Sequence, residues 1–329
     1  MQIPAMNGLK FLLAIFLLFG CSSSPENTQS DVSPKPDPSN PIYFHLQGDS
    51  LIWVLDPVRQ VFDSLEQFNR NWIDVAISGN GRYLIGLTSD SLFQFDLLNQ
   101  RIRNTYALKN TPLGNLSCSQ DASLLAFEGV AQGQRTVILF YLQDGLSQVF
   151  RKNSSNPLLS PSARWLAFNS AQKLIVSTVT DAREMILSNA QLIPQNFSPQ
   201  ESYLSASGKI FDLQVLQKFP VERNGLVKFI DELWLLWVEP QGQALTKSNL
   251  SGTQQSVLFE TPAPIIDFAI SAEKRFVVTV HQEEASLIFT AFDFLDQEMA
   301  FTISFPNPEN RIFHRLLWPE KPAGLTHDD

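Results

Sequence analysis

Histidine, cysteine and acidic side chains are the groups through which this sequence could carry out catalysis or hold a metal ion. The chain has 329 residues but only four histidines and two cysteines. It contains no Gly-x-Ser-x-Gly, no glycine-rich phosphate loop, no His-Glu-x-x-His and no Cys-x-x-Cys. The sequence therefore offers no catalytic motif, and we expect no catalytic residue, no metal site and no cofactor.

His45 and His314 are the histidines of most interest, because each lies in an apolar segment with the pattern of a β-strand and the expected fold pairs these two segments. Cross-strand neighbours have Cβ atoms about 4.5–5.5 Å apart, so the two imidazoles could share a proton or a metal ion. The alternative is that the two rings pack independently. His281 is expected in a solvated turn among glutamine and glutamates, and His327 in a polar tail.

Three aspartates end similar apolar segments: Asp56 in SLIWVLD, Asp96 in SLFQFD and Asp293 in LIFTAFD. Such acids could converge on a site. An aspartate that follows a strand also accepts hydrogen bonds from backbone N–H groups further along and stabilises a turn. Because the three segments belong to separate repeats, we predict turn capping. Cys118, in another strand-like segment, is expected to be a small buried hydrophobic residue.

The N-terminal residues have the pattern of a targeting signal. A run of nine apolar residues, Phe11–Phe19, follows Lys10; it is too short to cross a bilayer, whose core needs about 20 residues, and is typical of a signal peptide. Leu18-Phe19-Gly20-Cys21 resembles the lipobox of bacterial lipoproteins. The resemblance implies cleavage between Gly20 and Cys21 and a diacylglyceryl group on the Cys21 thiol, which anchors the chain in a membrane. An ordinary secreted protein cleaved near Gly20 is the alternative.

The segment after Cys21 is a spacer. Residues 22–41 contain six serines and five prolines, a composition that cannot bury enough apolar surface to fold by itself. Enterobacterial lipoproteins that stay in the inner membrane have an aspartate directly after the lipidated cysteine, where this chain has Ser22. The resemblance therefore favours the outer membrane of a bacterial envelope, with the protein facing the periplasm or the cell surface.

A repeat of about forty residues runs through the rest of the chain. It is marked by serines that end one apolar run and precede a polar turn and a second apolar run, with spacings of 41, 41, 38 and 73: Ser78, Ser119, Ser160, Ser198 and Ser271. Paired short apolar runs joined by polar turns predict antiparallel strands. The last spacing is close to two periods, which predicts a degenerate copy at residues 229–238, where Leu233–Val238 reads as a strand buried on both faces.

Units of forty residues with several short strands and no amphipathic helix predict a β-propeller. The segment SPSARWLAFNS resembles the repeat of WD40-like and TolB-type bacterial propellers, although the chain lacks the Trp-Asp and Gly-His dipeptides of true WD repeats. Residues 42–318 have room for about seven four-stranded blades in an all-β domain. A lone C-terminal strand, Arg311–Trp318, is expected to supply the missing inner strand of the first blade and close the ring.

The predicted organisation is therefore a signal peptide (1–20), a lipidated cysteine with its spacer (21–41), a single propeller (42–318) and a polar tail (319–329). The repeat is weakest at residues 187–229, where an inserted loop is an alternative. Trp53, Trp165, Trp234 and Trp237 are expected in the core, and Trp72 and Trp318 are expected to be partly exposed at blade ends.

A net charge of −9 disfavours binding to a nucleic-acid backbone. The lipobox, the spacer and the absence of catalytic motifs favour a non-catalytic binding or scaffold protein of the cell envelope, docked to other envelope proteins. Two alternatives stay open, which are binding of a small molecule, sugar or peptide in the propeller channel, and a propeller hydrolase or lyase. The sequence identifies neither the partner nor the face that binds it.

Overall fold

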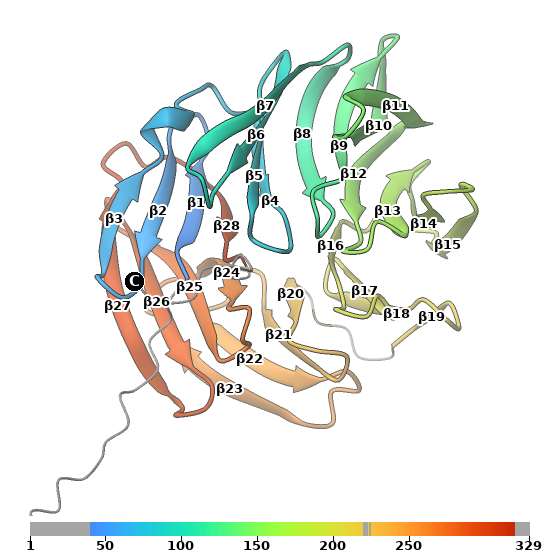
Figure 1. Ribbon diagram of the computed structural model, residues 1–329. Helices are drawn as coiled ribbons and strands as arrows, with labels where there is room; N and C mark the ends of the chain where they lie inside the picture. The colour runs from blue at the N-terminus through green and yellow to red at the C-terminus, as the bar shows by residue number, and fades with distance from the viewer. Residues whose placement is uncertain (1–39, 220–222, 224, 320–329) are drawn as a thin grey trace, which may run out of the picture. The chain divides into compact units, whose positions relative to one another are not determined.

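The computed structural model describes residues 40–219, 223 and 225–319. Within these residues the chain forms 28 β-strands and one short 3-10 helix, η1 (Glu66–Phe68). The strands make seven four-stranded antiparallel sheets, which follow one another around a ring (Figure 1). The seven-bladed β-propeller predicted from the serine repeat is confirmed.

The blades are numbered along the chain and their strands are given from the central axis outwards. Blade 1 contains β28 (Phe313–Leu317), β1 (Ile42–Leu46), β2 (Ile52–Asp56) and β3 (Val61–Ser64). Blade 2 contains β4 (Asp74–Ile77), β5 (Tyr83–Leu87), β6 (Ser91–Asp96) and β7 (Arg101–Ala107). Blade 3 contains β8 (Thr111–Cys118), β9 (Leu124–Ala131), β10 (Gln134–Tyr141) and β11 (Leu146–Lys152). Blade 4 contains β12 (Ser154–Leu159), β13 (Trp165–Ser170), β14 (Lys173–Thr178) and β15 (Glu184–Ser188).

The remaining three blades follow the same order. Blade 5 contains β16 (Pro194–Phe197), β17 (Tyr203–Ala206), β18 (Lys209–Asp212) and β19 (Gln217–Lys218). Blade 6 contains β20 (Leu226–Phe229), β21 (Trp234–Val238), β22 (Ala244–Asn249) and β23 (Gln255–Glu260). Blade 7 contains β24 (Ile265–Ile270), β25 (Phe276–Glu283), β26 (Ser286–Asp293) and β27 (Glu298–Pro306). Residues 187–229, where the repeat is weakest, thus contain blade 5, with short strands.

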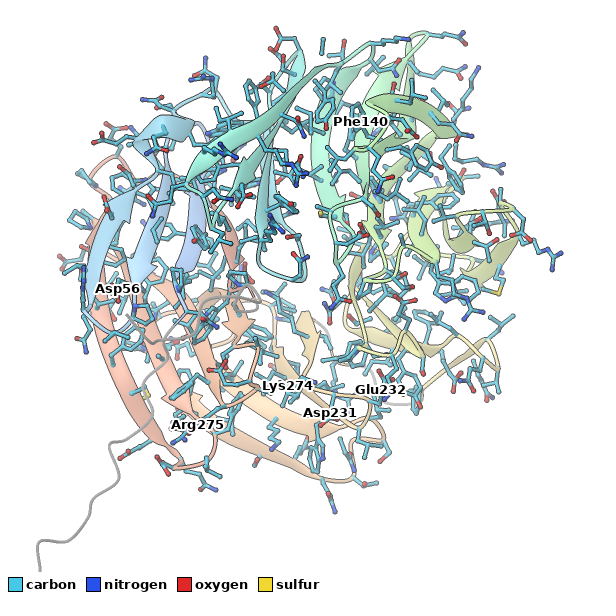
Figure 2. The ribbon with its side chains drawn as sticks, in the orientation of Figure 1. Asp56, Phe140, Asp231, Glu232, Lys274 and Arg275 are labelled. Atoms are coloured by element: carbon cyan, nitrogen blue, oxygen red, sulfur yellow. The ribbon has the colours of Figure 1, made fainter. Side chains whose placement is uncertain are left out.

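The core lies between neighbouring blades. The second strand of each blade is covered by a blade on either side, so β5 is buried at every position, whereas the outer strand β7 alternates between exposed and half-buried residues. Aromatic side chains fill these interfaces: Phe44 of blade 1 packs on Phe289 of blade 7 at 4.8 Å between ring centroids. Phe140 of blade 3, labelled in Figure 2, packs on Tyr106 of blade 2 at 5.2 Å between ring centroids.

The repeat serines are buried, and each organises the turn between the first and second strands of its blade. The serine Oγ accepts a hydrogen bond from the backbone N–H five residues later, which explains why a strand resumes at that position. The five bonds join Ser78 to Tyr83 (2.9 Å), Ser119 to Leu124 (3.1 Å), and Ser160, Ser198 and Ser271 to Trp165, Tyr203 and Phe276 (3.0 Å each).

In blade 6 this turn is shorter and an aspartate replaces the serine. Asp231 Oδ1 accepts hydrogen bonds from the N–H groups of Leu233 (2.7 Å) and Trp234 (2.8 Å). The neighbouring Glu232 accepts a hydrogen bond from Ser198 Oγ (2.8 Å) and so ties blade 6 to blade 5; both acids are labelled in Figure 2. The degenerate repeat is therefore found where it is predicted, but its strand begins at Trp234, and Leu233 is exposed in the turn.

The ring is closed by the C-terminal strand, as predicted. β28 pairs with β1 in antiparallel register, with Tyr43 opposite Leu317 and Phe44 opposite Leu316. Trp318, directly after β28, donates a hydrogen bond from Nε1 to Asn40 O at 3.1 Å. Because inner strands run towards the serine turns, the chain enters and leaves the ring at this end, which we call the serine-turn face. The opposite end, where loops cross from one blade to the next, is called the crossover face.

The expectation that Trp72 and Trp318 are partly exposed is wrong, because both are buried. The four tryptophans expected in the core are partly buried and pack against its hydrophobic clusters: Trp53, Trp165, Trp234 and Trp237. Trp72 lies in the loop between blades 1 and 2, where it stacks on Phe68 at 4.2 Å between ring centroids.

The predicted signal peptide with Gly20 and Cys21, the spacer up to residue 39 and tail residues 320–329 lie outside the described residues. In the part of the chain that is described, no helix is long and apolar enough to span a membrane.

Candidate functional site

The central channel is the concave site to which all seven blades of the propeller contribute. It encloses about 560 Å³ and is lined by residues from the inner strands of all seven blades. Its lining is apolar near the serine-turn face and polar near the crossover face. The apolar side chains include Ile77, Phe197, Phe229, Ile270 and Leu317, and the polar ones Asn115, Asn156, Gln195, Asp267, His314 and Arg315.

Asp74, the first residue of β4, is the buried centre of the polar part. Its carboxylate accepts hydrogen bonds from Leu116 N–H in blade 3 at 2.6 Å and from His314 Nε2 in blade 1 at 2.9 Å, and it lies 3.5 Å from Arg315 NH1. Burial by itself raises the pKa of Asp74, but the Arg315 charge and the His314 hydrogen bond outweigh it, so the pKa lies below its usual value. Arg315 also donates to Val75 O and Leu116 O, both at 2.8 Å.

Lys228 and Asp267 form a similar connection on the other side of the channel. Lys228 Nζ lies 2.8 Å from Asp267 Oδ1 and donates a second hydrogen bond to Phe268 O. Asp267 Oδ2 accepts a hydrogen bond from Leu316 N–H at 3.0 Å. These contacts join blades 6, 7 and 1, as the Asp74 contacts join blades 1, 2 and 3.

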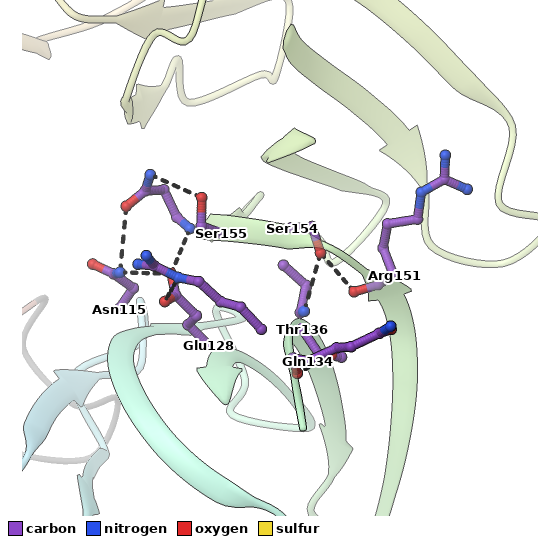
Figure 3. A network of polar contacts seen from close by, with 10 residues as sticks. Asn115, Glu128, Gln134, Thr136, Arg151, Ser154 and Ser155 are labelled. Atoms are coloured by element: carbon purple, nitrogen blue, oxygen red, sulfur yellow. Dashed lines mark hydrogen bonds and ion pairs between the residues drawn. The ribbon is translucent and has the colours of Figure 1, made fainter. Parts of the chain in front are cut away.

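A third polar network surrounds Glu128 of β9, whose side chain is buried between blades 3 and 4 (Figure 3). Glu128 accepts hydrogen bonds from Asn115 Nδ2 at 3.1 Å, from Asn156 N–H at 2.9 Å and from Arg135. Asn115 Nδ2 also lies 3.3 Å from Asn156 Oδ1. Both asparagines have positive φ, 53° and 52°, a conformation that asparagine tolerates better than most residues.

Sequence reasoning missed these channel residues, although the sequence carries a signal for them. Asp74, Asn115, Asn156 and Asp267 each lie four residues before a repeat serine. Side chains at one position of a repeat occupy equivalent places in successive blades. A polar residue at this position in four blades therefore predicts a ring of polar groups around the axis.

His45 and His314 are brought together as predicted, with ring centroids 5.5 Å apart in an edge-to-face arrangement. The structure also supplies other partners, because His314 bonds Asp74 and His45 Nε2 lies 3.2 Å from Asp49 O. Burial lowers the pKa of His45 and favours its neutral form. Across the described ranges no group of three or more His, Cys, Asp or Glu side chains is arranged to hold a metal ion.

The expectation for His281 is wrong. Its side chain is buried within β25, and Nε2 lies 3.0 Å from Glu283 Oε1. The polar residues that suggested a turn form the end of the strand, and the actual turn lies further along at residues 284–285. Cys118 also differs from expectation, because it is half-buried and lines the channel; burial raises the pKa of its thiol.

The strand-ending aspartates cap turns, as predicted. The Oδ1 atoms of Asp56, Asp96 and Asp293 each accept hydrogen bonds from the N–H groups two and three residues later, at 2.8–3.3 Å. Asp212 makes the same contacts in blade 5, to the N–H groups of Gln214 and Val215. These carboxylates lie in turns of separate blades and do not form a common site.

Comparison with known proteins supports the fold without identifying a family. No protein-family model matches the sequence, and no curated protein sequence is significantly similar to it. Among solved structures, the β-propeller domain of Cps50 (Swd1) from Myceliophteria thermophila has a TM-score of 0.53 and 16% identity, covering 72% of this chain and 87% of that domain. TolB from Acinetobacter baumannii has a TM-score of 0.54 and 11% identity, covering 87% of this chain and 68% of TolB.

An oligogalacturonate lyase in complex with manganese is similar to the same degree, with a TM-score of 0.56 and 11% identity over 74% of this chain and 87% of the lyase. Identities this low establish the fold alone, and the similar proteins include an enzyme as well as TolB. The class that fold and repeats define is a seven-bladed β-propeller with WD40-like repeats.

Proposed function

We propose that this protein is a non-catalytic binding or scaffold protein of the bacterial cell envelope, anchored through a lipid on Cys21. One observation carries the non-catalytic part of the proposal. The charged side chains that line the channel, Lys228, Asp267, His314 and Arg315, all bond one another, Asp74 or the backbone of a neighbouring blade.

General acid–base catalysis needs a titratable group that can reach the substrate and exchange a proton with it. Asp74 is 1% exposed, and its oxygens already accept hydrogen bonds from His314, Val75 N–H and Leu116 N–H. Asp267 accepts from Lys228 and Leu316 N–H. Redirecting either carboxylate to a substrate would break connections between blades. These groups are therefore suited to holding the ring rigid around its channel.

The anchoring part of the proposal rests on Leu18-Phe19-Gly20-Cys21 and on the serine- and proline-rich residues that follow. The chain contains one other cysteine, Cys118, which provides a matched control. In a bacterial host supplied with radiolabelled palmitate, wild-type protein and Cys118→Ala should carry label and sediment with membranes. Cys21→Ala should do neither. Label on Cys21→Ala, or wild-type protein found only in the soluble fraction, would contradict the anchor.

The scaffold role is tested by reversible cross-linking in intact cells, followed by purification from detergent-solubilised membranes. We expect at least one envelope protein in near-stoichiometric yield with the wild-type protein. A purification that returns the propeller alone would argue against the role, since a scaffold acts through its partners.

A further inference from the structure

A groove between the outer strands of blades 1 and 2 is a second large cavity of the propeller, with a volume of about 920 Å³. Its walls come from β1, β2, β3 and η1 of blade 1 and from residues between 95 and 100 of blade 2. Asp56, labelled in Figure 2, lies at its serine-turn end. Small-molecule sites typically enclose about 300–1,000 Å³, so the groove is large enough for such a ligand. It shares no lining residue with the channel.

The strand register places three side chains of blade 1 in one row on the wall of this groove. Val54 of β2 is opposite Tyr43 of β1 on one side and opposite Asp63 of β3 on the other, and all three residues line the groove. Side chains of directly opposed residues point to the same face of a sheet, and neighbouring strands lie about 4.7–4.9 Å apart. A small group above Val54 therefore lies between the side chains of Tyr43 and Asp63.

Tyr43 brings a hydroxyl group to the groove wall without giving it a partner. The residue is 7% exposed, and within the described part of the chain its hydroxyl makes no hydrogen bond. Burial raises the pKa of Tyr43 to about 12, so the group is a neutral phenol at pH 7. A buried hydroxyl without a partner loses its hydration and gains nothing in return. The wall is thus suited to a ligand that forms a hydrogen bond at this place.

The charged groups of the groove lining are three carboxylates and one guanidinium. Arg59 lies 3.7 Å from Asp56, across the turn between β2 and β3. Asp63 and Glu66 are exposed and form no ion pair with other described residues. Asp63 Oδ1 accepts a hydrogen bond from the adjacent Ser64 N–H, which leaves the second oxygen of this carboxylate available. The lining therefore has an excess of two negative charges.

Two cations outside the lining do not cancel this local excess. The Arg70 guanidinium lies over the Phe93 ring, 5.5 Å from its centroid, and donates a hydrogen bond to Asn69 O. Arg101 begins β7, where it is opposite Asp96 in the strand register. Exposed charges more than about 8 Å apart are largely screened at physiological salt. The unpaired carboxylates of the lining therefore set the charge that a ligand meets in the groove.

The rest of the lining is mostly apolar. Val54 and Leu65 of blade 1 pack in one hydrophobic cluster with Phe95 and Leu97 of blade 2. Such walls favour hydrocarbon or aromatic groups. A bare metal ion does not suit the groove, since the described residues contain no group of three or more His, Cys, Asp or Glu side chains arranged to hold one. The complementary ligand has an apolar body and a positive charge.

From the row of side chains, the unpaired carboxylates and the apolar walls, we infer that this groove binds a small organic cation, which is a protonated amine attached to a hydrocarbon or aromatic body. The ammonium group lies above Val54 and donates hydrogen bonds to the Asp63 carboxylate and the Tyr43 hydroxyl. The apolar body packs on Phe95 and Leu97. The site is separate from the channel, and the inference goes beyond the proposed scaffold function without depending on it.

Hexylamine is the probe for the test, because an alkyl amine, like the lysine side chain with its pKa of about 10.4, is protonated at pH 7. Hexanol and hexanoate keep the apolar body and replace the positive charge by no charge or a negative one, and spermidine keeps positive charge without the apolar body. Binding to the full chain in detergent micelles is measured by isothermal titration calorimetry, with heats for protein-free micelles subtracted. The Kd of hexylamine should be at least about fivefold lower than that of each other compound, equivalent to about 1 kcal/mol.

The double variant Asp63→Asn with Glu66→Gln removes both unpaired carboxylates and should fold normally, because both residues are exposed. Its control, Asp144→Asn with Glu273→Gln, removes the same charge from exposed turn residues of blades 3 and 7. Circular dichroism and the unfolding midpoint of both variants are checked first. The groove variant should raise the Kd of hexylamine at least about fivefold and that of hexanol less than about twofold, and the control should change each less than about twofold.

Tyr43→Phe locates the amine within the groove, because it removes only the hydroxyl oxygen. This oxygen has no partner among the described residues, so its loss should not lower the free energy of unfolding. The Kd of hexylamine should rise at least about threefold in this variant. The inference is overturned if hexanol, hexanoate or spermidine binds as tightly as hexylamine. It is equally overturned if the groove variant behaves like its control, or if Tyr43→Phe leaves the Kd of hexylamine unchanged.

Discussion

Replacing Asp74 by alanine should destabilise the propeller strongly, because its carboxylate joins three blades. Loss of the carboxylate leaves Leu116 N–H, which is buried, without its partner at 2.6 Å, a cost of about 1–3 kcal/mol. It also removes the counter-ion of Arg315 and the acceptor of His314, whose side chains are 29% and 31% exposed. Solvent screens this charge interaction, so we assign it about 1 kcal/mol. The expected loss of unfolding free energy is about 2–4 kcal/mol.

Urea unfolding followed by tryptophan fluorescence measures this loss, with Asp63→Ala as control. Asp63 is exposed and, within the described part of the chain, accepts a hydrogen bond only from the adjacent Ser64 N–H. Its loss should therefore change the free energy of unfolding by less than about 0.5 kcal/mol. The depressed pKa of Asp74 adds a pH test. Its stabilisation is present above the unfolded-state pKa, near 4, and is lost as pH falls through the folded-state pKa. The gap between wild type and Asp74→Ala should therefore shrink below about pH 4. Equal stability of the two alanine variants at pH 7 would refute the proposed role of Asp74 in joining the blades.

Three further predictions test the closure and the packing of the ring. Ending the chain after Asn310 removes β28, which pairs with β1, and should abolish cooperative unfolding followed by circular dichroism. Ending the chain after Pro319 keeps β28 and should preserve the cooperative transition. A cooperative transition without β28 would contradict closure of the ring by that strand. Gly86→Ala would place a Cβ atom 2.2 Å from the buried indole ring of Trp72. The midpoint of urea unfolding should therefore fall by an amount equivalent to about 1–3 kcal/mol. An unchanged midpoint would show that the indole ring can shift to make room. Because the pKa of His45 is lowered, its imidazole binds a proton more readily in the unfolded chain than in the folded one. The free energy of unfolding of the wild-type protein should therefore fall by up to about 1.4 kcal/mol per pH unit below about pH 6.5. This pH dependence should be weaker in His45→Phe, and an equal dependence in both proteins would assign it to another group.

The repeat could be predicted from the sequence because each of its recurring residues makes a hydrogen bond to a backbone group close to it along the chain. A repeat serine caps a turn five residues long, and Asp56, Asp96 and Asp293 bond N–H groups two and three residues ahead. Such contacts leave a fixed spacing in the sequence. The closing strand could also be predicted, since an unpaired apolar strand at each end of a repeat array has one partner available.

The polar connections around the channel could not be predicted in the same way. Asp74 meets His314 across 240 residues of chain, so no local spacing records the contact. The burial of Trp72 could not be predicted either, because this residue lies in a loop but its ring packs on Phe68 and Phe93. His281 shows the same limit, because its polar neighbours end a strand and do not form the turn.

The joining of the two chain ends has a consequence for biosynthesis. Asn40 and Trp318, which bond across the closure, are 278 residues apart along the chain. While the polypeptide emerges from the ribosome or a translocation pore, β1 has no inner neighbour, and its apolar residues stay uncovered until the final blade is complete. Contacts this distant in sequence slow folding and leave a strand edge open to association with other chains. We therefore expect nascent chains that lack only their last twenty residues to depend heavily on chaperones.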